Sequence, residues 1–298
     1  MSTSIHAVLR TIRARLEAVS DAPEREAEWL LEQVSGLSRS EQLLHINNNL
    51  PDSQRAQLDS LTTRRLQGEP LAYVLGEQHF WTLRLKVTPA VLIPRPETEL
   101  VVERALQHLS KHPAARVLDL GTGSGAIALA VARDRPEAQV MAVDQSMAAL
   151  AVAQENAAIH HLGNVTFLHS DWFSAIPRQR FDLIVSNPPY IADGDPHLEP
   201  AVLAHEPTAA LISGHDGLDA IRQIVTQAGG FLASDGWLVL EHGWQQATAV
   251  RQLLESAGFS SVASHADLAG HARVTEAGPP DHLPATRITT PSINRELP

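Results

Sequence analysis

The residues best suited to chemistry are Ser186-Asn187-Pro188-Pro189-Tyr190, which follow the apolar run 181–185. That run is rich in β-branched residues and stops at Asn-Pro, so it predicts a short buried strand that ends in a turn. Two successive prolines fix φ near about −65° at each, which makes the turn stiff before anything binds. A stiff polar loop at the carboxyl end of a strand is where an open α/β sheet binds its ligand. The alternative is a proline-rich turn with Tyr190 packed on the core.

A second motif lies upstream, Asp119-Leu120-Gly121-Thr122-Gly123-Ser124-Gly125, between a predicted strand and a predicted helix. Glycine is needed there because a side chain would prevent the tight turn and the close approach of the backbone to a ligand. Asp144 ends the next predicted strand, nineteen residues after Gly125. A carboxylate at that strand tip can accept hydrogen bonds from both ribose hydroxyls. Together the two features predict a cofactor that contains ribose.

The glycine spacing, G-x-G-x-G, differs from the dinucleotide fingerprint G-x-G-x-x-G, which places a pyrophosphate on a helix N-terminus. S-adenosyl-L-methionine has no phosphate and carries an ammonium, a carboxylate and a sulfonium instead. Asp119 suits the cationic part of that molecule. Asp171 can accept a hydrogen bond from the adenine amino group, and Trp172 offers a flat apolar face, although a core aromatic is the alternative for Trp172.

The elements around these motifs alternate strand and helix from Arg116 onward, which predicts an α/β fold with a mostly parallel sheet covered on both faces. In residues 1 to about 75, apolar residues recur at helical spacing. From about residue 276 onward the sequence contains turn-forming residues and has no periodicity. The predicted parts are a helical domain at 1–75, a β-hairpin linker at 76–96, a catalytic domain at 97–275 and a disordered tail at 276–298.

Composition excludes several classes of protein. The 298 residues are 44% hydrophobic and 19% charged, as in ordinary globular proteins. A formal charge of −11 argues against a protein that holds nucleic acid mainly by its phosphates. The absence of Cys excludes disulfides, zinc thiolates and a Cys nucleophile. His108 and His112 alone have an H-x-x-x-H spacing and no acid between them, so no metal site is predicted.

Nothing in the sequence predicts a membrane protein. No stretch approaches the roughly 18 apolar residues of a membrane span, and the N-terminus lacks the apolar region of a secretory signal. We therefore expect a cytoplasmic protein.

The two motifs together resemble the class I S-adenosylmethionine-dependent methyltransferases (Rossmann-like) that act on a planar nitrogen. A longer pattern resembles the PrmC/HemK family, the protein-(glutamine-N5) methyltransferases of peptide chain release factors, over about residues 5 to 275. It comprises Gly68-Glu69-Pro70, Ile93-Pro94-Arg95-Pro96-Glu97-Thr98-Glu99, Glu206-Pro207, Asp216-Gly217-Leu218 and Asp267-Leu268-Ala269-Gly270.

The resemblance implies that Gly121 to Gly125, Asp144, Trp172 and Asn187 bind S-adenosyl-L-methionine, with S-adenosyl-L-homocysteine as the product. It also implies that Asn187 to Tyr190 bind the glutamine of the Gly-Gly-Gln loop in release factors 1 and 2. The helical domain would help to hold the factor, and Arg95 and Glu97 would support the site. We expect a monomer that has no direct contact with nucleic acid.

Asn187, Pro188 and Tyr190 are the candidate catalytic residues. A carboxamide nitrogen is a poor nucleophile because its lone pair is delocalised into the carbonyl. The Asn187 side-chain oxygen and the Pro188 carbonyl can accept its N–H bonds, and Tyr190 can stack on the amide plane. No general base is evident.

Three alternatives compete with this interpretation. A methyltransferase for adenine or guanine amino groups also uses Asn-Pro-Pro-Tyr, but it needs base flipping and a basic groove. A non-catalytic cofactor-binding protein would bind the cofactor without transfer to any substrate. An NAD-dependent dehydrogenase requires a different glycine spacing and an acid for hydride transfer.

Overall fold

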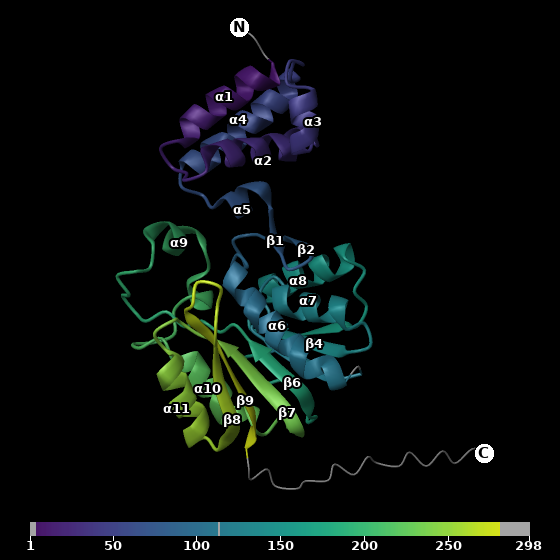
Figure 1. Cartoon of the computed structure of the whole chain (residues 1–298), viewed down its shortest axis with the longest axis vertical. Helices are drawn as coiled ribbons and strands as arrows, with labels where there is room; N and C mark the ends of the chain where they lie inside the picture. The colour runs from purple at the N-terminus through teal and green to yellow at the C-terminus, as the bar shows by residue number, and fades with distance from the viewer. Residues whose placement is uncertain (1–3, 113, 281–298) are drawn as a thin grey trace, which may run out of the picture.

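The structure is a computed structural model that describes residues 4–112 and 114–280. Figure 1 shows two parts along the longest axis, a group of helices at the N-terminal end and a larger sheet-containing domain below it. A short helix and a hairpin connect them.

The N-terminal part is a helical bundle of α1 (Ile5–Leu16), α2 (Pro23–Ser35), α3 (Arg39–Leu44) and α4 (Asp52–Leu66). Their apolar faces meet in a core that includes Leu16, Leu30, Leu31 and Leu58, all nearly inaccessible to solvent. Burial of a leucine side chain stabilises a fold by about 1.5–3 kcal/mol, so this core accounts for much of the bundle's stability.

The connection begins with α5 (Leu71–Leu75), a short helix at the end of the predicted helical domain. Pro70 precedes it and Gly76 ends it with φ +78°, a conformation that glycine adopts without strain. The hydroxyl of Tyr73 donates to the carbonyl of Val91 over 2.5 Å, which ties α5 to the segment before the catalytic domain. The antiparallel hairpin of β1 (Glu77–Phe80) and β2 (Leu83–Lys86) follows, and Phe80, Leu83 and Leu85 join the catalytic core.

The catalytic domain contains a seven-stranded sheet with the order β5-β4-β3-β6-β7-β9-β8. Five strands run parallel, and β9 lies antiparallel between β7 and β8. The strands are β3 (Arg116–Leu120), β4 (Gln139–Asp144), β5 (Val165–His169), β6 (Phe181–Ser186), β7 (Leu232–Glu241), β8 (Phe259–Ala266) and β9 (Ala272–Pro280). This is the fold of a class I S-adenosylmethionine-dependent methyltransferase, as the sequence predicted.

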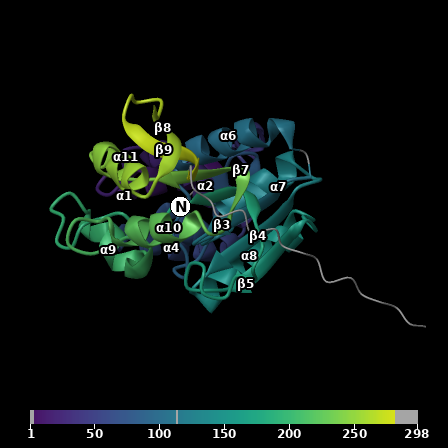
Figure 2. The same ribbon diagram turned by 90° about the horizontal axis from the view of Figure 1, so that it is seen from below.

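Helices cover both faces of the sheet. The helices are α6 (Glu99–His108), α7 (Ala126–Asp134), α8 (Met147–Ile159), α9 (Pro200–His205), α10 (Asp219–Ala228) and α11 (Ala247–Ser256), with single 3-10 turns η1 (Pro96–Thr98), η2 (Leu109–Lys111) and η3 (Thr208–Ala210). Helices α6 and α7 contribute to the core on one face, and α10 and α11 contribute to the core on the other (Figure 2).

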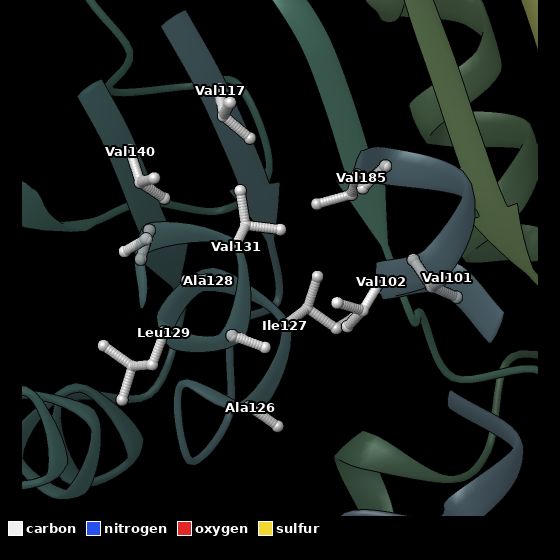
Figure 3. Close-up of a cluster of buried hydrophobic side chains, with 14 of the residues drawn as sticks. Val101, Val102, Val117, Ala126, Ile127, Ala128, Leu129, Val131, Val140 and Val185 are labelled. Atoms are coloured by element: carbon white, nitrogen blue, oxygen red, sulfur yellow. The ribbon is translucent and has the colours of Figure 1, made fainter. Parts of the chain in front are cut away.

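Strand pleating explains how one strand serves both cores. In β3, Val117 faces α6 and α7, whereas Leu118 and Leu120 face α10 and α11. Figure 3 shows the first core, where Val117 and Val185 of the sheet meet Ile127 and Val131 of α7. Because both faces are covered, the middle of β4 and of β6 is mainly apolar, and the polar residues Asp144 and Ser186 come at their carboxyl ends.

One boundary differs from the sequence prediction. Strand β9 extends to Pro280, so residues 276–280 belong to the sheet and not to a disordered tail. The alternation that marks an antiparallel strand is hidden there by Gly278 and two prolines, which are typical of turns. Residues 281–298, the rest of the predicted tail, lie outside the described residues. Helix α10 ends at Ala228, and β7 begins at Leu232.

Across residues 4–112 and 114–280, every helix is too short or too polar to cross a lipid bilayer.

Candidate active site

A pocket lies at the edge of the sheet where parallel strands present their carboxyl ends. The loops after β3, β4, β5 and β6 line it with Gly121–Ser124, Asp144, Asp171–Trp172 and Asn187. Strand β3 lies between β4 and β6 in the sheet. The chain continues from β3 to β4 on one side and returns later to β6 on the other side. The boundary between β3 and β6 is therefore the topological switch point of the sheet. Ligands of open α/β sheets bind at such a point.

The glycine-rich loop wraps the end of β3. Gly121 and Gly123 have φ values of +71° and +56°, which disfavour any residue with a Cβ. The amides of Gly121 and Thr122 both donate to the carbonyl of Val143 at 2.9 Å, which fixes the loop to the tip of β4. These two bonds therefore position the loop relative to β4.

Asp119 lies behind this loop and not among the residues that line the pocket. It is 1% exposed, and its Oδ2 accepts from the Thr122 hydroxyl at 2.7 Å and the Ala128 amide at 3.2 Å. Burial raises the pKa of its carboxyl to about 7, against the effect of those hydrogen bonds. Its position supports a role in holding the loop to α7, whereas the sequence suggested contact with the cationic part of a ligand.

Asp144 stands at the tip of β4 and lines the pocket, as its spacing predicted. Its Oδ2 accepts from the Gly123 amide at 2.9 Å and its Oδ1 from the Ser146 amide at 2.8 Å. Each carboxylate oxygen has a second lone pair, so both remain able to accept from a diol.

Asp171 and Trp172 follow β5 and complete one side of the pocket. Trp172 has φ +46°, an unfavourable conformation for a bulky residue. Its carbonyl accepts from the Ser170 hydroxyl at 2.7 Å, and its ring would lie 3.6 Å from a Cβ placed on Gly121. Strained residues are found where the surroundings hold them for function, and here the indole is held against the glycine loop.

The loop Asn187–Tyr190 borders the pocket through Asn187 and Pro189, while Pro188 and Tyr190 are not among the lining residues. The side-chain amide nitrogen of Asn187 donates to Thr98 Oγ1 at 3.1 Å. The Tyr190 hydroxyl donates to Glu241 Oε1 at 3.1 Å, and burial raises the pKa of that tyrosine.

The carbonyl of Tyr190 is held as well. It accepts from Gln246 Nε2 at 2.9 Å. Gly217, at φ +74°, lies so close that a Cβ there would come within 2.3 Å of the same carbonyl oxygen. The loop is thus held at both ends, by Thr98 at Asn187 and by Gln246 and Gly217 at Tyr190.

Arg95 lies outside the pocket lining. It forms an ion pair with Glu206, a residue whose side chain is 1% exposed, and Glu206 Oε2 also accepts from the Ile93 amide at 3.1 Å. The pair holds the segment that begins at Pro207, which lines the pocket. Glu97 is exposed and is not a lining residue.

Sequence reasoning missed three residues of this site. Thr98 and Glu241 lie under Asn187 and Tyr190, and Gln246 holds the loop from α11's N-cap position. Glu241 could have been suspected, because it is an acid at the carboxyl end of an apolar strand. Thr98 and Gln246 carry no comparable signal.

The lining residues fit S-adenosylmethionine on chemical grounds. No Lys, Arg or His is among the described residues that line the pocket, so nothing there would neutralise a phosphate. The lining contains two carboxylates, an indole and a glycine loop. The loop is open, because a Cβ on Gly123 would meet no atom within 4 Å. These groups suit a nucleoside with a cationic tail.

Comparison with known proteins gives two matching family models. The model described as "Methyltransferase small domain" matches residues 101–205, and the model described as "PrmC N-terminal domain" matches residues 7–76.

Two curated relatives cover nearly the whole chain, and both are named "Release factor glutamine methyltransferase". The protein from Coxiella burnetii is 46% identical over 91% of this chain and 97% of its own length. The protein from Escherichia coli is 48% identical over 90% of this chain and 96% of its own length. A solved protein-(glutamine-N5) methyltransferase (release factor-specific) from Alicyclobacillus acidocaldarius is 31% identical, with a TM-score of 0.40 over 66% of this chain and 99% of that chain.

Proposed function

The chain belongs to the family of release factor glutamine methyltransferases, and from this premise we propose how its pocket performs the reaction. It is a protein-(glutamine-N5) methyltransferase. One observation carries the proposal. Four separate strand ends line a single pocket with Gly121–Ser124, Asp144, Asp171–Trp172 and Asn187, and none of the described lining residues is basic.

We assign the cofactor side of the pocket to S-adenosyl-L-methionine. Asp144 would accept from the ribose hydroxyls, and Asp171 from the adenine amino group. The Trp172 ring would lie against the adenine, and the glycine loop would pass close to the rest of the molecule. The pocket then also accepts the product, S-adenosyl-L-homocysteine.

The substrate side is formed by Asn187 to Tyr190. Asn187 Oδ1 and the Pro188 carbonyl would accept the two N–H bonds of a glutamine side chain, and the Tyr190 ring would fix its plane. Two acceptors also stabilise positive charge as it develops on the nitrogen, which is the logic of an oxyanion hole with reversed sign. The amide resonance that opposes attack is large, as the barrier of roughly 18–20 kcal/mol to rotation about a peptide bond indicates.

S-adenosylmethionine, when bound, supplies a methyl group attached to a sulfonium. The electron pair of the amide nitrogen forms the new N–C bond. The electron pair of the broken C–S bond stays on sulfur. The methylated nitrogen then releases one proton to water. Positioning by Asn187 and Pro188 brings the two reactants in line, an effect worth up to about 7–11 kcal/mol in well-oriented systems. No covalent enzyme intermediate is needed.

We further propose release factors 1 and 2 as the protein substrates, with the Gly-Gly-Gln loop entering the pocket and the α1–α4 bundle holding the rest of the factor. A monomeric cytoplasmic enzyme that does not contact nucleic acid fits this role. The formal charge of −11 supports the last point.

The test is transfer of labelled methyl from S-adenosylmethionine to a purified release factor. The same factor with the Gly-Gly-Gln glutamine changed to alanine, and duplex DNA, serve as controls. Label on the unmodified factor alone, mapped to that glutamine by mass spectrometry, is the expected result. Label on DNA, or on the alanine variant, contradicts the proposal.

A further inference from the structure

The turn between β8 and β9 carries the motif Asp267-Leu268-Ala269-Gly270, and none of its residues lines the pocket. Leu268 is fully exposed, and Trp244, in the loop after β7, is 53% exposed. A single exposed apolar residue is ordinary in a soluble protein, whereas large apolar residues that gather on one surface mark an interaction site.

The two loops that carry these residues form one surface. The ring of Trp244 lies against the ring of His271, with the ring centroids 5.5 Å apart. The amide of Asp267 donates to the carbonyl of His271 at 2.8 Å, which closes the turn that presents Leu268. We call Trp244, Leu268 and His271 the rim surface.

We propose that the rim surface is a docking site for the protein substrate, and that it binds an apolar segment of the release factor beside the loop that is methylated. The inference rests on the proposed function, because the release factor is the protein that has to lie over this end of the sheet. Trp244 and Leu268 contribute to binding of the factor and take no part in methyl transfer.

The rim surface lies at the same end of the sheet as the substrate loop. Ser186, the last residue of β6 before that loop, is in register with Leu240 of β7. Leu240 is in turn in register with Thr275 of β9. Neighbouring strands are about 4.8 Å apart, so β9 passes about 10 Å from the start of the substrate loop. Figure 1 shows the turn between β8 and β9 in yellow, at the end of the sheet nearer the helical bundle.

A folded protein that presents a glutamine to Asn187 also covers this turn. A stable protein–protein interface buries about 800 Å² of each partner, and a circle of that area has a radius of about 16 Å. This radius exceeds the distance of about 10 Å between β6 and β9. An interface centred on the substrate loop therefore includes the rim surface, and the release factor is the occupant to which the geometry points.

The loop that carries Trp244 is also bonded to the substrate loop. The amide of Gly243 donates to Gln246 Oε1 at 2.8 Å, and Gln246 Nε2 donates to the carbonyl of Tyr190 at 2.9 Å. Trp244 lies between Gly243 and Gln246 in the chain. The rim surface is therefore continuous with the wall of the substrate side.

The turn is held in the conformation that exposes Leu268. Asp267 Oδ1 accepts from the amides of Ala269 and His271, both at 2.9 Å, and Oδ2 accepts from Arg273 Nε at 3.3 Å. A preformed turn loses little conformational entropy when a partner binds, so more of the energy of apolar burial contributes to affinity. Tryptophan is also among the residues that most often dominate the energy of an interface.

Steady-state kinetics tests the proposal with Leu268→Ser and Trp244→Ala. Each should raise KM for the release factor about 10-fold or more, because burial of a large apolar side chain is lost. The value of kcat at saturating factor and the Kd for S-adenosylmethionine should stay within about twofold, as expected when binding common to the ground and transition states is removed.

Ile159→Ser is the matched control. Ile159 is 51% exposed, and it ends α8 at the opposite end of the sheet, where β5 begins. All three quantities should keep their wild-type values in this variant. A wild-type KM in either Leu268→Ser or Trp244→Ala overturns the inference, and so does a fall in kcat without a rise in KM, which would mean that the residue acts on the substrate loop.

The outcomes separate this inference from the proposed function. If the wild-type enzyme methylates the factor and the two variants keep its KM, the inference fails and the proposed function stands. If the wild-type enzyme methylates no release factor, the proposed function fails and the inference fails with it.

A second measurement detects the contact without catalysis. The chain contains no cysteine, so Leu268→Cys introduces a single thiol. Release factor should slow alkylation of this thiol in proportion to the fraction of enzyme bound, and it should not slow alkylation of Ile159→Cys. Equal alkylation rates of Leu268→Cys with and without the factor overturn the inference. Protection that grows with enzyme concentration alone assigns the surface to a second copy of the chain and also overturns it.

Discussion

Gly217 offers the sharpest single test of how the substrate loop is held. A Cβ at this residue would lie 2.3 Å from the Tyr190 carbonyl oxygen and 2.8 Å from Gln246 Nε2. Contact between a carbon and a carbonyl oxygen requires more than about 3.2 Å, so Gly217→Ala has to displace the Tyr190 carbonyl by about 1 Å. That displacement also breaks the 2.9 Å bond from Gln246.

The expected effect has two separable parts. The positive φ of +74° alone costs about 1–2 kcal/mol of stability for alanine. Displacement of the loop adds a catalytic loss, because an error of about 1 Å in positioning lowers the rate on the order of 100-fold. We therefore expect Gly217→Ala to lose stability modestly and kcat strongly.

Gly36→Ala is the matched control. Gly36 has nearly the same φ, +72°, but a Cβ there would meet no atom within 4 Å, and the residue ends α2 in the helical bundle. Thermal unfolding should show a similar conformational cost for both variants, whereas steady-state methylation should be slow only for Gly217→Ala. Equal kcat in the two variants would refute the view that this contact holds the loop in its productive position.

Three further predictions concern single side chains. Asn187→Ala should lose most of kcat while its melting temperature stays near the wild-type value, and an unchanged kcat would contradict its role as acceptor. Asp144→Ala should mainly raise the Kd for S-adenosylmethionine, by roughly 10-fold or more if two bonds to the ribose are lost, which calorimetry measures. Burial raises the pKa of Asp119 from 3.8 to about 7, so the protonated form favours folding and this contribution is lost as pH rises from about 4 to 7. Over that range wild-type stability to urea should fall relative to Asp119→Asn by up to about 4 kcal/mol, and parallel pH profiles of the two proteins would show that Asp119 does not titrate in this way.

Much of the cofactor side follows from the sequence because each part is local. The glycine loop follows one predicted strand and Asp144 ends the next. Parallel strands bring their carboxyl ends to one edge of the sheet. The same rule applies to Asn187, whose neighbour Ser186 is in register with Leu120 of β3. Sequence spacing and the topological rule together are sufficient for these residues.

The parts that sequence reasoning missed depend on contacts between distant segments. Thr98 and Glu241 are 143 residues apart in the chain, yet both bond the substrate loop, Thr98 at Asn187 and Glu241 at Tyr190. Asp119 was assigned to the cationic part of the ligand from its place in the motif, and its bonds from Thr122 and Ala128 to Oδ2 are contacts that the motif does not predict. Neither feature has a signature in residue type or spacing.

The C-terminal boundary shows a related limit. Residues 276–280 include Gly278, Pro279 and Pro280, which favour turns, but β9 continues through them because Glu276 and its neighbours pair with β7 and β8. The Glu276 carboxylate is also bonded by Arg104 and His108 of α6. Tertiary contacts here outweigh local propensity.

The most direct test of the central claim is a crystal structure of the enzyme with S-adenosylhomocysteine and a release factor. We predict that the glutamine amide nitrogen lies within about 3 Å of both Asn187 Oδ1 and the Pro188 carbonyl, with Asn187 Nδ2 still bonded to Thr98. A glutamine nitrogen held by other acceptors, or an Asn187 amide turned with its nitrogen toward the substrate, would contradict it.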